Sequence, residues 1–199
     1  MAKTAVLLPV YNGEKFLREC IDSILFQSHK EFALIICDDF SSDGSLEILQ
    51  RYAAVDSRIK ILHNDQNLGI AATRNKLLQA LPAECDFIAI MDADDVMFPE
   101  RLEQQLGYLE EHPDIAAVGT ALEIIDEQGR NVGYRKYPTS SDDLRKNILK
   151  SNPISQSSLM LRRKVIDAIG LYRTDMAVCE DYDYWLRAML KFNFVNLPH

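Results

Sequence analysis

The chain has 199 residues, of which 47% are hydrophobic and 26% are charged, and its formal net charge at pH 7 is −8. This length and composition are typical of a globular protein of one large or two small domains, which can bury a core without disulfides or structural metals. The negative charge argues against general nucleic-acid binding, which depends on Lys and Arg at the phosphates.

The first half of the chain alternates between short apolar runs and amphipathic segments. Runs such as "TAVLLPV" are typical of strands buried on both faces, and segments such as "GEKFLRECIDSILFQ" carry apolar residues at helical spacing. In chain order the pattern predicts strands at 4–10, 32–39, 58–63 and 86–92, which alternate with helices at 13–27, 41–55, 67–81 and 99–112. This alternation predicts a parallel sheet covered by helices, so we expect residues 1–111 to form a Rossmann-like nucleotide-binding half.

The second half has a different pattern. A strand at 115–126, a Gly-containing turn and a second strand at 134–138 predict a hairpin. The elements expected after it are a short helix at 140–150, a strand-like run at 155–163, a helical turn at 164–170 and an amphipathic helix at 180–192. Because no Pro-, Ser- or Gly-rich linker separates the halves, we expect one domain over residues 1–199, with 112–199 as its acceptor-side half.

The four cysteines, Cys20, Cys37, Cys85 and Cys179, are widely spaced, and no Cys-x-x-Cys or zinc pattern occurs. We expect four reduced thiols, as in a cytoplasmic protein, with Cys37 as a small core residue. The N-terminal apolar run is too short for a signal peptide, and no segment has the apolar length of a membrane span.

Polar residues follow each predicted strand of the first half, in "PVYNG", "DDFSSDGS", "HNDQNLG" and "DADD". In a parallel sheet these groups lie at one edge, where ligands bind. Turns and helix caps explain many of them, but not Asp92, Asp94 and Asp95, whose mutual repulsion calls for a positive charge. Because an Asp-x-Asp pair can share Mg²⁺ or Mn²⁺ with a substrate diphosphate, we predict a divalent metal here.

Five segments together resemble the inverting family-2 glycosyltransferases and occur in that family's order: "LLPVYNGEKFLRECIDSIL", "IICDDFSSDGS", "NLGIAATRN", "MDADDVMFPERL" and "EDYDYWLR". The resemblance covers essentially the whole chain. It implies a GT-A-type α/β fold, with a mainly parallel central sheet flanked by helices and a smaller acceptor-side subregion. It also implies a nucleotide-sugar donor, with UDP as the expected nucleotide, and Mn²⁺ or Mg²⁺ as cofactor.

The resemblance assigns nucleotide-binding roles to particular residues. Pro9 and Tyr11 resemble positions that line the nucleoside pocket, and Asp39 resembles the acid that accepts a hydrogen bond from the uracil ring. Arg74 resembles the family's basic contact near the pyrophosphate, although a surface Arg paired with an acid explains it equally well.

Four acids receive roles in the same way. Asp94 is the expected metal ligand, Asp92 is expected at the ribose or the metal, and Asp95 supports them. Asp181, with Glu180 as the alternative, resembles the general base that takes the proton of the acceptor hydroxyl. Acids also favour a helix N-terminus, so stabilisation of the last predicted helix is the competing explanation.

The resemblance therefore implies transfer of a single sugar to a glycan or lipid-linked acceptor, in cell-surface polysaccharide or glycoconjugate synthesis. The Gln-x-x-Arg-Trp pattern of processive synthases is absent. The chain ends soon after the last predicted helix, which raises the expectations of a piece cut from a longer protein and of peripheral association with the inner face of a membrane. The alternatives are a sugar-1-phosphate nucleotidyltransferase, for which the first loop has too few glycines, and a non-catalytic nucleotide-sugar-binding module.

Overall fold

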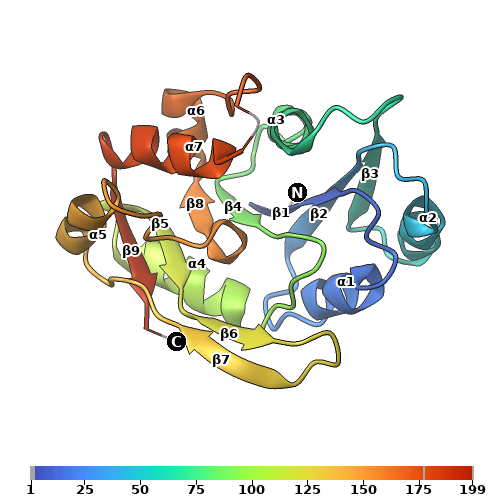
Figure 1. Ribbon diagram of the computed structural model, residues 1–199, viewed down its shortest axis with the longest axis horizontal. Helices are drawn as coiled ribbons and strands as arrows, with labels where there is room; N and C mark the ends of the chain where they lie inside the picture. Colours follow the sequence, from blue (N-terminus) through green and yellow to red (C-terminus); the bar gives the residue numbers. More distant parts are fainter. Residues whose placement is uncertain (1–2, 177, 199) are drawn as a thin grey trace.

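The computed structural model describes residues 3–176 and 178–198, and within them seven strands form one sheet in the order β3-β2-β1-β4-β8-β5-β9 (Figure 1). The strands of this sheet are β1 (Thr4–Val10), β2 (Phe32–Asp38), β3 (Ile59–His63), β4 (Phe87–Ile90), β5 (Ile115–Thr120), β8 (Met160–Arg162) and β9 (Asn193–Leu197). All neighbouring strands are parallel except β8, which runs antiparallel to β4 and β5. The predicted α/β fold with a mainly parallel sheet is confirmed.

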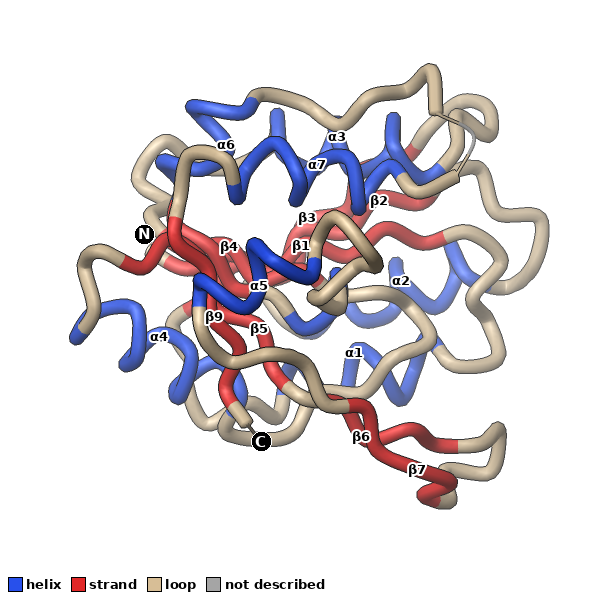
Figure 2. Tube along the Cα trace, turned by 60° about the vertical axis from the view of Figure 1, so that its left-hand side comes forward, coloured by secondary structure: helices blue, strands red, loops and turns tan. Residues whose placement is uncertain are grey.

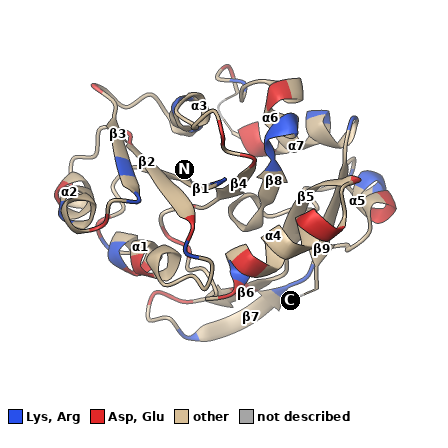
Figure 3. Ribbon diagram, turned by 180° about the vertical axis from the view of Figure 1, so that it is seen from behind, with Lys and Arg blue, Asp and Glu red and all other residues tan. Residues whose placement is uncertain are grey.

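Helices cover both faces of this sheet (Figures 1 and 2). One face packs against α1 (Leu17–Leu25), α2 (Ser45–Val55) and α4 (Arg101–Glu111). The other face packs against α3 (Ile70–Gln79), α5 (Ser141–Asn147), α6 (Arg163–Ile169) and α7 (Glu180–Met189). Figure 3 shows that charged residues are spread over the outer helices, whereas the strands are mostly uncharged.

Strand β1 shows why the strands are continuously apolar. Ala5 and Leu7 point into the core under α3 and α7, whereas Val6 and Leu8 point into the core under α1 and α2. Successive side chains of a strand point to opposite faces, so a strand covered on both sides needs apolar residues at every position. Burial of these two cores is the main source of stability of the fold.

The predicted strand at 115–126 is wrong in one respect, because the structure divides it in two. Strand β5 ends at Thr120, the last residue paired with β9, and Ala121 N donates to Leu197 O (3.2 Å). The chain then leaves the main sheet, and β6 (Leu122–Ile125) pairs only with β7 (Asn131–Arg135). Figure 2 shows this hairpin apart from the main sheet.

The predicted strand at 155–163 is also shorter than expected. Its first part is a 3₁₀ turn, Gln156–Ser158, closed by the hydrogen bond from Ser158 N to Ser155 O (3.2 Å). The side chain of Gln156 is buried, where it accepts from Trp185 Nε1 (2.6 Å) and donates to the Tyr172 hydroxyl (2.9 Å). A local turn and these distant partners therefore replace the predicted strand pairing.

The carboxyl ends of β1 to β4 lie at one edge of the sheet, as predicted, because these strands are parallel neighbours. Pro9 fits inside the central strand β1 because of the direction in which its backbone hydrogen bonds would point. Val10 O accepts from Asp39 N on the β2 side, whereas Leu7 O accepts from Met91 N on the β4 side. The missing N–H of Pro9 faces the β4 side just beyond Leu7, the last residue of β1 that pairs with β4, so the ladder between β1 and β4 ends where Pro9 cannot donate.

All four cysteines are free thiols, and Cys37 is buried in the core as expected. Burial raises the pKa of Cys37 and that of Cys85 to about 11, so both stay protonated at neutral pH. In the part of the chain that the structure describes, no helix has the length and hydropathy needed to cross a membrane.

Candidate active site

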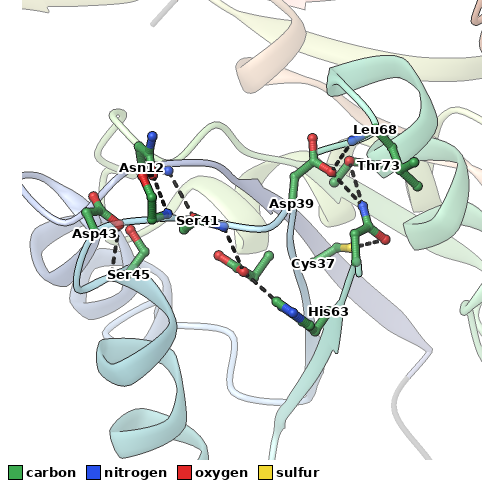
Figure 4. Close-up of polar contacts among 12 residues, drawn as sticks. Asn12, Cys37, Asp39, Ser41, Asp43, Ser45, His63, Leu68 and Thr73 are labelled. Carbon is green, nitrogen blue, oxygen red and sulfur yellow. Dashed lines mark hydrogen bonds and ion pairs between the residues drawn. The ribbon is translucent and has the colours of Figure 1, made fainter. Parts of the chain in front are cut away.

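The turns after β1 and β2 are built from each other's side chains (Figure 4). Asn12 has a left-handed backbone (φ 50°), and its Oδ1 accepts from Ser42 N (2.8 Å) while its N–H donates to Ser41 Oγ (3.0 Å). Gly13 N donates to Ser45 Oγ (2.9 Å) at the start of α2. These residues form turns, as the alternative explanation from turn chemistry predicts, and Tyr11 is 54% exposed at the edge of the sheet.

Asp39 is almost fully buried and braces the loop that leads into α3. Its Oδ1 accepts from Asn64 Nδ2 (2.7 Å) and Leu68 N (2.8 Å), and its Oδ2 accepts from Gly69 N (2.9 Å; Figure 4). Hydrogen bonds to a charged acceptor are stronger than neutral ones, so this carboxylate fixes the entry to α3. Its predicted contact with uracil stays a prediction, and the structure adds a bracing role.

Asp38, for which the sequence predicts no role, also has specific partners. It is fully buried at the end of β2, and its Oδ2 accepts from Ser41 N (3.2 Å) and lies 3.0 Å from His63 Nδ1 (Figure 4). The two adjacent acids therefore point to opposite faces, Asp38 toward His63 and Asp39 toward α3. A helix cap needs only one acid, whereas Asp38 and Asp39 each have their own hydrogen-bond partners.

Pro9 lies below the edge of the sheet rather than on its surface. It is buried, and together with Arg74 and Tyr172 it lines a void of about 10 Å³. A void of this size holds about one water molecule, far less than a nucleoside. The predicted contact of Pro9 with a nucleoside stays a prediction.

Arg74 is buried and joins two acids from distant parts of the chain. Only 8% of the residue is exposed, its Nη2 donates to Asp92 Oδ1 (2.9 Å), and its Nη1 donates to Glu180 Oε1. The alternative prediction, a surface Arg paired with an acid, is therefore wrong about the surface position, whereas the pairing with acids is present. A buried Arg with two carboxylate partners is fixed in place, because breaking either pair leaves a charge uncompensated. Its predicted contact with a pyrophosphate stays a prediction.

A second cation lies behind the acidic loop that follows β4. Arg101 donates from Nη2 to the carbonyl oxygens of Ile90 (3.0 Å) and Leu159 (3.3 Å). Burial lowers the pKa of Arg101 to about 10, against the opposing effect of Asp95 and Asp92, and the side chain stays charged at neutral pH. Desolvation, together with the charges of Asp92 and Asp94, raises the pKa of Asp95 above its usual range.

The protein itself supplies two positive charges near the acids that follow β4, Arg74 and Arg101. A bound metal is therefore not the sole counter-charge, and the predicted metal stays a prediction. Neither Arg was predicted for this purpose, because each comes from a helix outside the acidic loop. Asp94 has no such partner among the described residues, and it is exposed.

The acids fit a divalent cation only if a ligand completes its coordination. Within residues 3–176 and 178–198, no three His, Cys, Asp or Glu side chains converge on one point. Asp92 and Asp94 together supply two carboxylates, and one oxygen of Asp92 is bonded to Arg74. Mg²⁺ is commonly bound by one or two carboxylates plus substrate phosphates, so this donor set suits a cation that arrives with a diphosphate.

Asp94 also lines a cleft of about 200 Å³ on the α1 side of the loop. The other walls are Phe16 and Glu19 of the α1 region and the turn of the β6–β7 hairpin. Lys15 Nζ pairs with Glu127 Oε2 (2.6 Å) and ties that turn to the α1 region. Both partners are well exposed, so this pair adds about 0–1 kcal/mol at most.

The two acids that begin α7 have different surroundings. Cys179, in a left-handed conformation (φ 62°), turns the chain into the helix without a side-chain cap. Glu180 is buried, and its carboxylate is held by Arg74. Asp181 is partly exposed, and its Oδ2 accepts from Asn152 Nδ2 (3.1 Å). The sequence did not indicate Asn152, which lies in a loop 29 residues away.

Comparisons with known proteins agree with this architecture. The sequence model of the family described as "Glycosyl transferase family 2" matches residues 5–170. The protein EpsE of Bacillus subtilis is 39% identical over 188 residues, which cover 93% of this chain and 66% of EpsE. The amylovoran biosynthesis glycosyltransferase AmsE of Erwinia amylovora is 29% identical over 197 residues, which cover 98% of this chain and 73% of AmsE.

Solved structures share the fold at lower sequence identity. S. aureus TarS 1–349 in complex with UDP-GlcNAc has a TM-score of 0.81 and 22% identity, over 99% of this chain and 56% of that one. The mannosyltransferase PcManGT from Pyrobaculum calidifontis, in complex with GDP-Man and Mn²⁺, has a TM-score of 0.74 and 18% identity, over 98% of this chain and 55% of that one. The present chain thus spans just under two thirds of EpsE and little more than half of these two solved chains.

Proposed function

The chain belongs to glycosyl transferase family 2, and on that premise we propose that it moves one sugar from a UDP-sugar to a hydroxyl group of a glycan or lipid-linked acceptor, with inversion at the anomeric carbon. The name of AmsE, a glycosyltransferase of amylovoran biosynthesis, supports a role in making a surface polysaccharide or glycoconjugate. The UDP-GlcNAc complex of TarS supports a UDP-linked donor. The GDP-Man and Mn²⁺ complex of PcManGT supports a divalent metal.

One observation carries the proposal: Arg74 joins the acid at the end of β4 to the acid at the start of α7. Only the Arg74 side chain separates Asp92, which is expected to face the sugar donor, from Glu180 of the "EDYD" segment, which is expected to face the acceptor. A transferase needs both within one site, because the acceptor hydroxyl must reach the anomeric carbon of the bound donor. A site that only binds a nucleotide has no need of the second acid.

The chemistry assigned to the chain's own residues is a single displacement. Asp181 takes the proton of the acceptor hydroxyl as its oxygen forms a bond to the anomeric carbon. The bond from that carbon to the diphosphate oxygen breaks on the opposite face, so the configuration inverts. Glu180 is the weaker candidate for the base, because its carboxylate is buried against Arg74 and carries a charge-assisted bond. A divalent cation held by Asp94 and Asp92 would neutralise the leaving diphosphate.

A panel of UDP-, GDP-, CDP- and dTDP-sugars tests the proposal. We expect release of nucleoside diphosphate from at least one UDP-sugar, slowly to water and faster when a glycan acceptor is added. Release of pyrophosphate from a sugar 1-phosphate and a nucleoside triphosphate would instead identify a nucleotidyltransferase. Tight binding of a UDP-sugar with no release under any condition would identify a binding module.

Replacing Asp39 by Asn should reduce the preference for UDP over CDP. The variant has one carboxylate oxygen fewer to meet the N–H groups of Leu68 and Gly69 and the ring N–H of uracil. Because a buried donor is left unsatisfied, we also expect a loss of stability of about 1–3 kcal/mol. Calorimetric titration with both nucleotides measures the preference, and thermal unfolding measures the stability.

The control for Asp39 is Asn64→Ala, which removes another partner of the same carboxylate. It should destabilise the loop while leaving Asp39 able to accept from the base. If Asp39→Asn and Asn64→Ala change the UDP to CDP ratio equally, Asp39 only braces the loop and does not read the base.

A further inference from the structure

Asn152 lies in the loop between α5 and the 3₁₀ turn, and its side-chain amide bridges two parts of the fold. Its Oδ1 accepts from Ile154 N (3.3 Å), and its Nδ2 donates to Asp181 Oδ2 (3.1 Å). The bond to Ile154 fixes the orientation of the amide, because a backbone N–H can only meet the oxygen. The NH₂ group is therefore directed at Asp181 and cannot turn away without losing a second bond.

The loop that carries Asn152 is itself anchored in the core. Asn196 Nδ2 of β9 donates to the carbonyl oxygen of Pro153 (3.2 Å), and Ile154 is 2% exposed. Asn152 is thus held between two fixed points rather than on a free loop. A donor fixed in this way restricts the carboxylate of Asp181 to one orientation.

The bond also leaves one oxygen of Asp181 available. Among the residues that the structure describes, Asp181 Oδ2 has one hydrogen-bond donor and Oδ1 has none, and the residue is partly exposed. Glu180 differs, since its carboxylate is buried and is held by Arg74. A base needs one oxygen held in position and another directed at the hydroxyl, and Asp181 has this arrangement.

We propose that Asn152 is a positioning residue for the base Asp181: it orients the carboxylate so that the second oxygen faces the acceptor hydroxyl. This inference rests on the proposed function for the identity of the base, but the contact itself does not. Asn152 touches no reacting atom, and it acts only through Asp181.

The charged and titratable groups around Asp181 are paired elsewhere or neutral, so none of those named below takes the place of Asn152 as its hydrogen-bond donor. Glu180 and Arg74 are paired with each other, and Arg74 is also paired with Asp92. Burial, with smaller contributions from Asp92 and Asp181, raises the pKa of Tyr172 to about 12, so this phenol stays neutral. Asn152 is thus the neutral donor that the structure places on Asp181.

The test compares Asn152→Ala and Asn152→Asp with the control Asn147→Asp. Asn147 is a partly exposed residue of α5 whose Nδ2 donates to Asp143 O (2.8 Å) rather than to Asp181, so it undergoes the same chemical change without altering the contact to Asp181. The first readout is the ¹³C titration of the Asp181 carboxyl group, assigned by its absence from the spectrum of Asp181→Asn. This readout needs no substrate and no activity.

We expect Asn152→Asp to move the Asp181 titration to higher pH by about one pH unit or more, because a like charge disfavours the ionised form. The acidic limb of the rate profile for UDP release should move with it, and Asn152→Ala should slow release roughly 10- to 100-fold through misplacement of the base. The Kd for UDP should stay within about twofold, and Asn147→Asp should behave as the wild type.

An Asp181 titration that is the same in Asn152→Asp and in the wild type would overturn the proposal, whether or not the chain is active. A wild type that releases no nucleotide from any donor, with the titration shifted as expected, would contradict the proposed function and leave the contact established. Equal losses of rate in Asn152→Ala and Asn147→Asp would show a general structural effect and would also overturn the positioning role.

Discussion

Asp181→Asn should lower the rate of sugar transfer by roughly 10²–10⁴-fold, the usual loss when a positioned proton acceptor is removed. The Asn side chain keeps the shape of Asp, and its oxygen can still accept from Asn152 Nδ2. The Kd for UDP and the melting temperature should therefore stay close to the wild-type values. Stopped assays of UDP release, calorimetry and thermal unfolding measure the three quantities.

The competing explanation of Asp181, a charge that stabilises the N-terminus of α7, predicts a different outcome. Such a charge is worth about 0.3–1 kcal/mol, so its loss would lower the melting temperature slightly and leave turnover near normal. Glu180→Gln is the matched control, because it makes the same change one residue away. It should mainly destabilise the chain, since it removes the charge of one of the two carboxylates that pair with the buried Arg74, while Asp92 remains. If Asp181→Asn keeps its turnover and Glu180→Gln loses it, Glu180 is the base.

Removal of divalent metal should nearly abolish UDP binding. Asp92 and Asp94 carry negative charge, as does the diphosphate, so without a cation between them the two repel each other. Asp94→Asn should weaken Mn²⁺-dependent UDP binding by roughly 100-fold or more, because even residues outside the coordination shell cost 10–100-fold. Calorimetric titration of UDP, with excess Mn²⁺ and then with excess chelator, measures both effects.

The control for the metal prediction is Asp167→Asn on α6. It removes the same charge from an exposed side chain that pairs only with Arg163 among the described residues, far along the sequence from the acidic loop. Its UDP affinity should match the wild type with and without metal. Equal affinity of the wild-type chain for UDP in Mn²⁺ and in chelator would contradict the metal assignment, and Arg74 and Arg101 would then offset the charge of the acids.

Local patterns predicted most of the first half correctly. The apolar runs and the helical spacing placed β1 to β4 and α1 to α4, and the predicted boundaries differ from the observed ones mainly at helix starts. The segment before α1 shows why: Phe16 N and Leu17 N both donate to Gly13 O, so the turn after β1 uses residues that the periodicity assigned to the helix. Likewise, α4 begins at Arg101, two residues after the proline that was expected near its start.

Predictions were less accurate where the partner of a segment is distant. The run at 115–126 has one continuous strand pattern, but only the part up to Thr120 finds a neighbour in β9. The antiparallel insertion of β8 between β4 and β5 has no local sign at all, since a three-residue strand takes its direction from the strands on either side. Such pairing depends on the global arrangement rather than on propensity.

The sequence by itself determined the α/β class and the edge where the polar groups gather, because periodicity and turn chemistry act over a few residues. It indicated Asp92 and Asp94 through their crowding after a strand, and Glu180 and Asp181 through the resemblance to the family. Only the tertiary structure decided what each acid meets. Arg74 contacts Glu180 across 106 residues of sequence, and Asn152 contacts Asp181 across 29. A carboxylate that is buried and ion-paired differs chemically from one that is partly exposed and held by a neutral amide. That difference arises from burial and from partners that meet only in the folded chain.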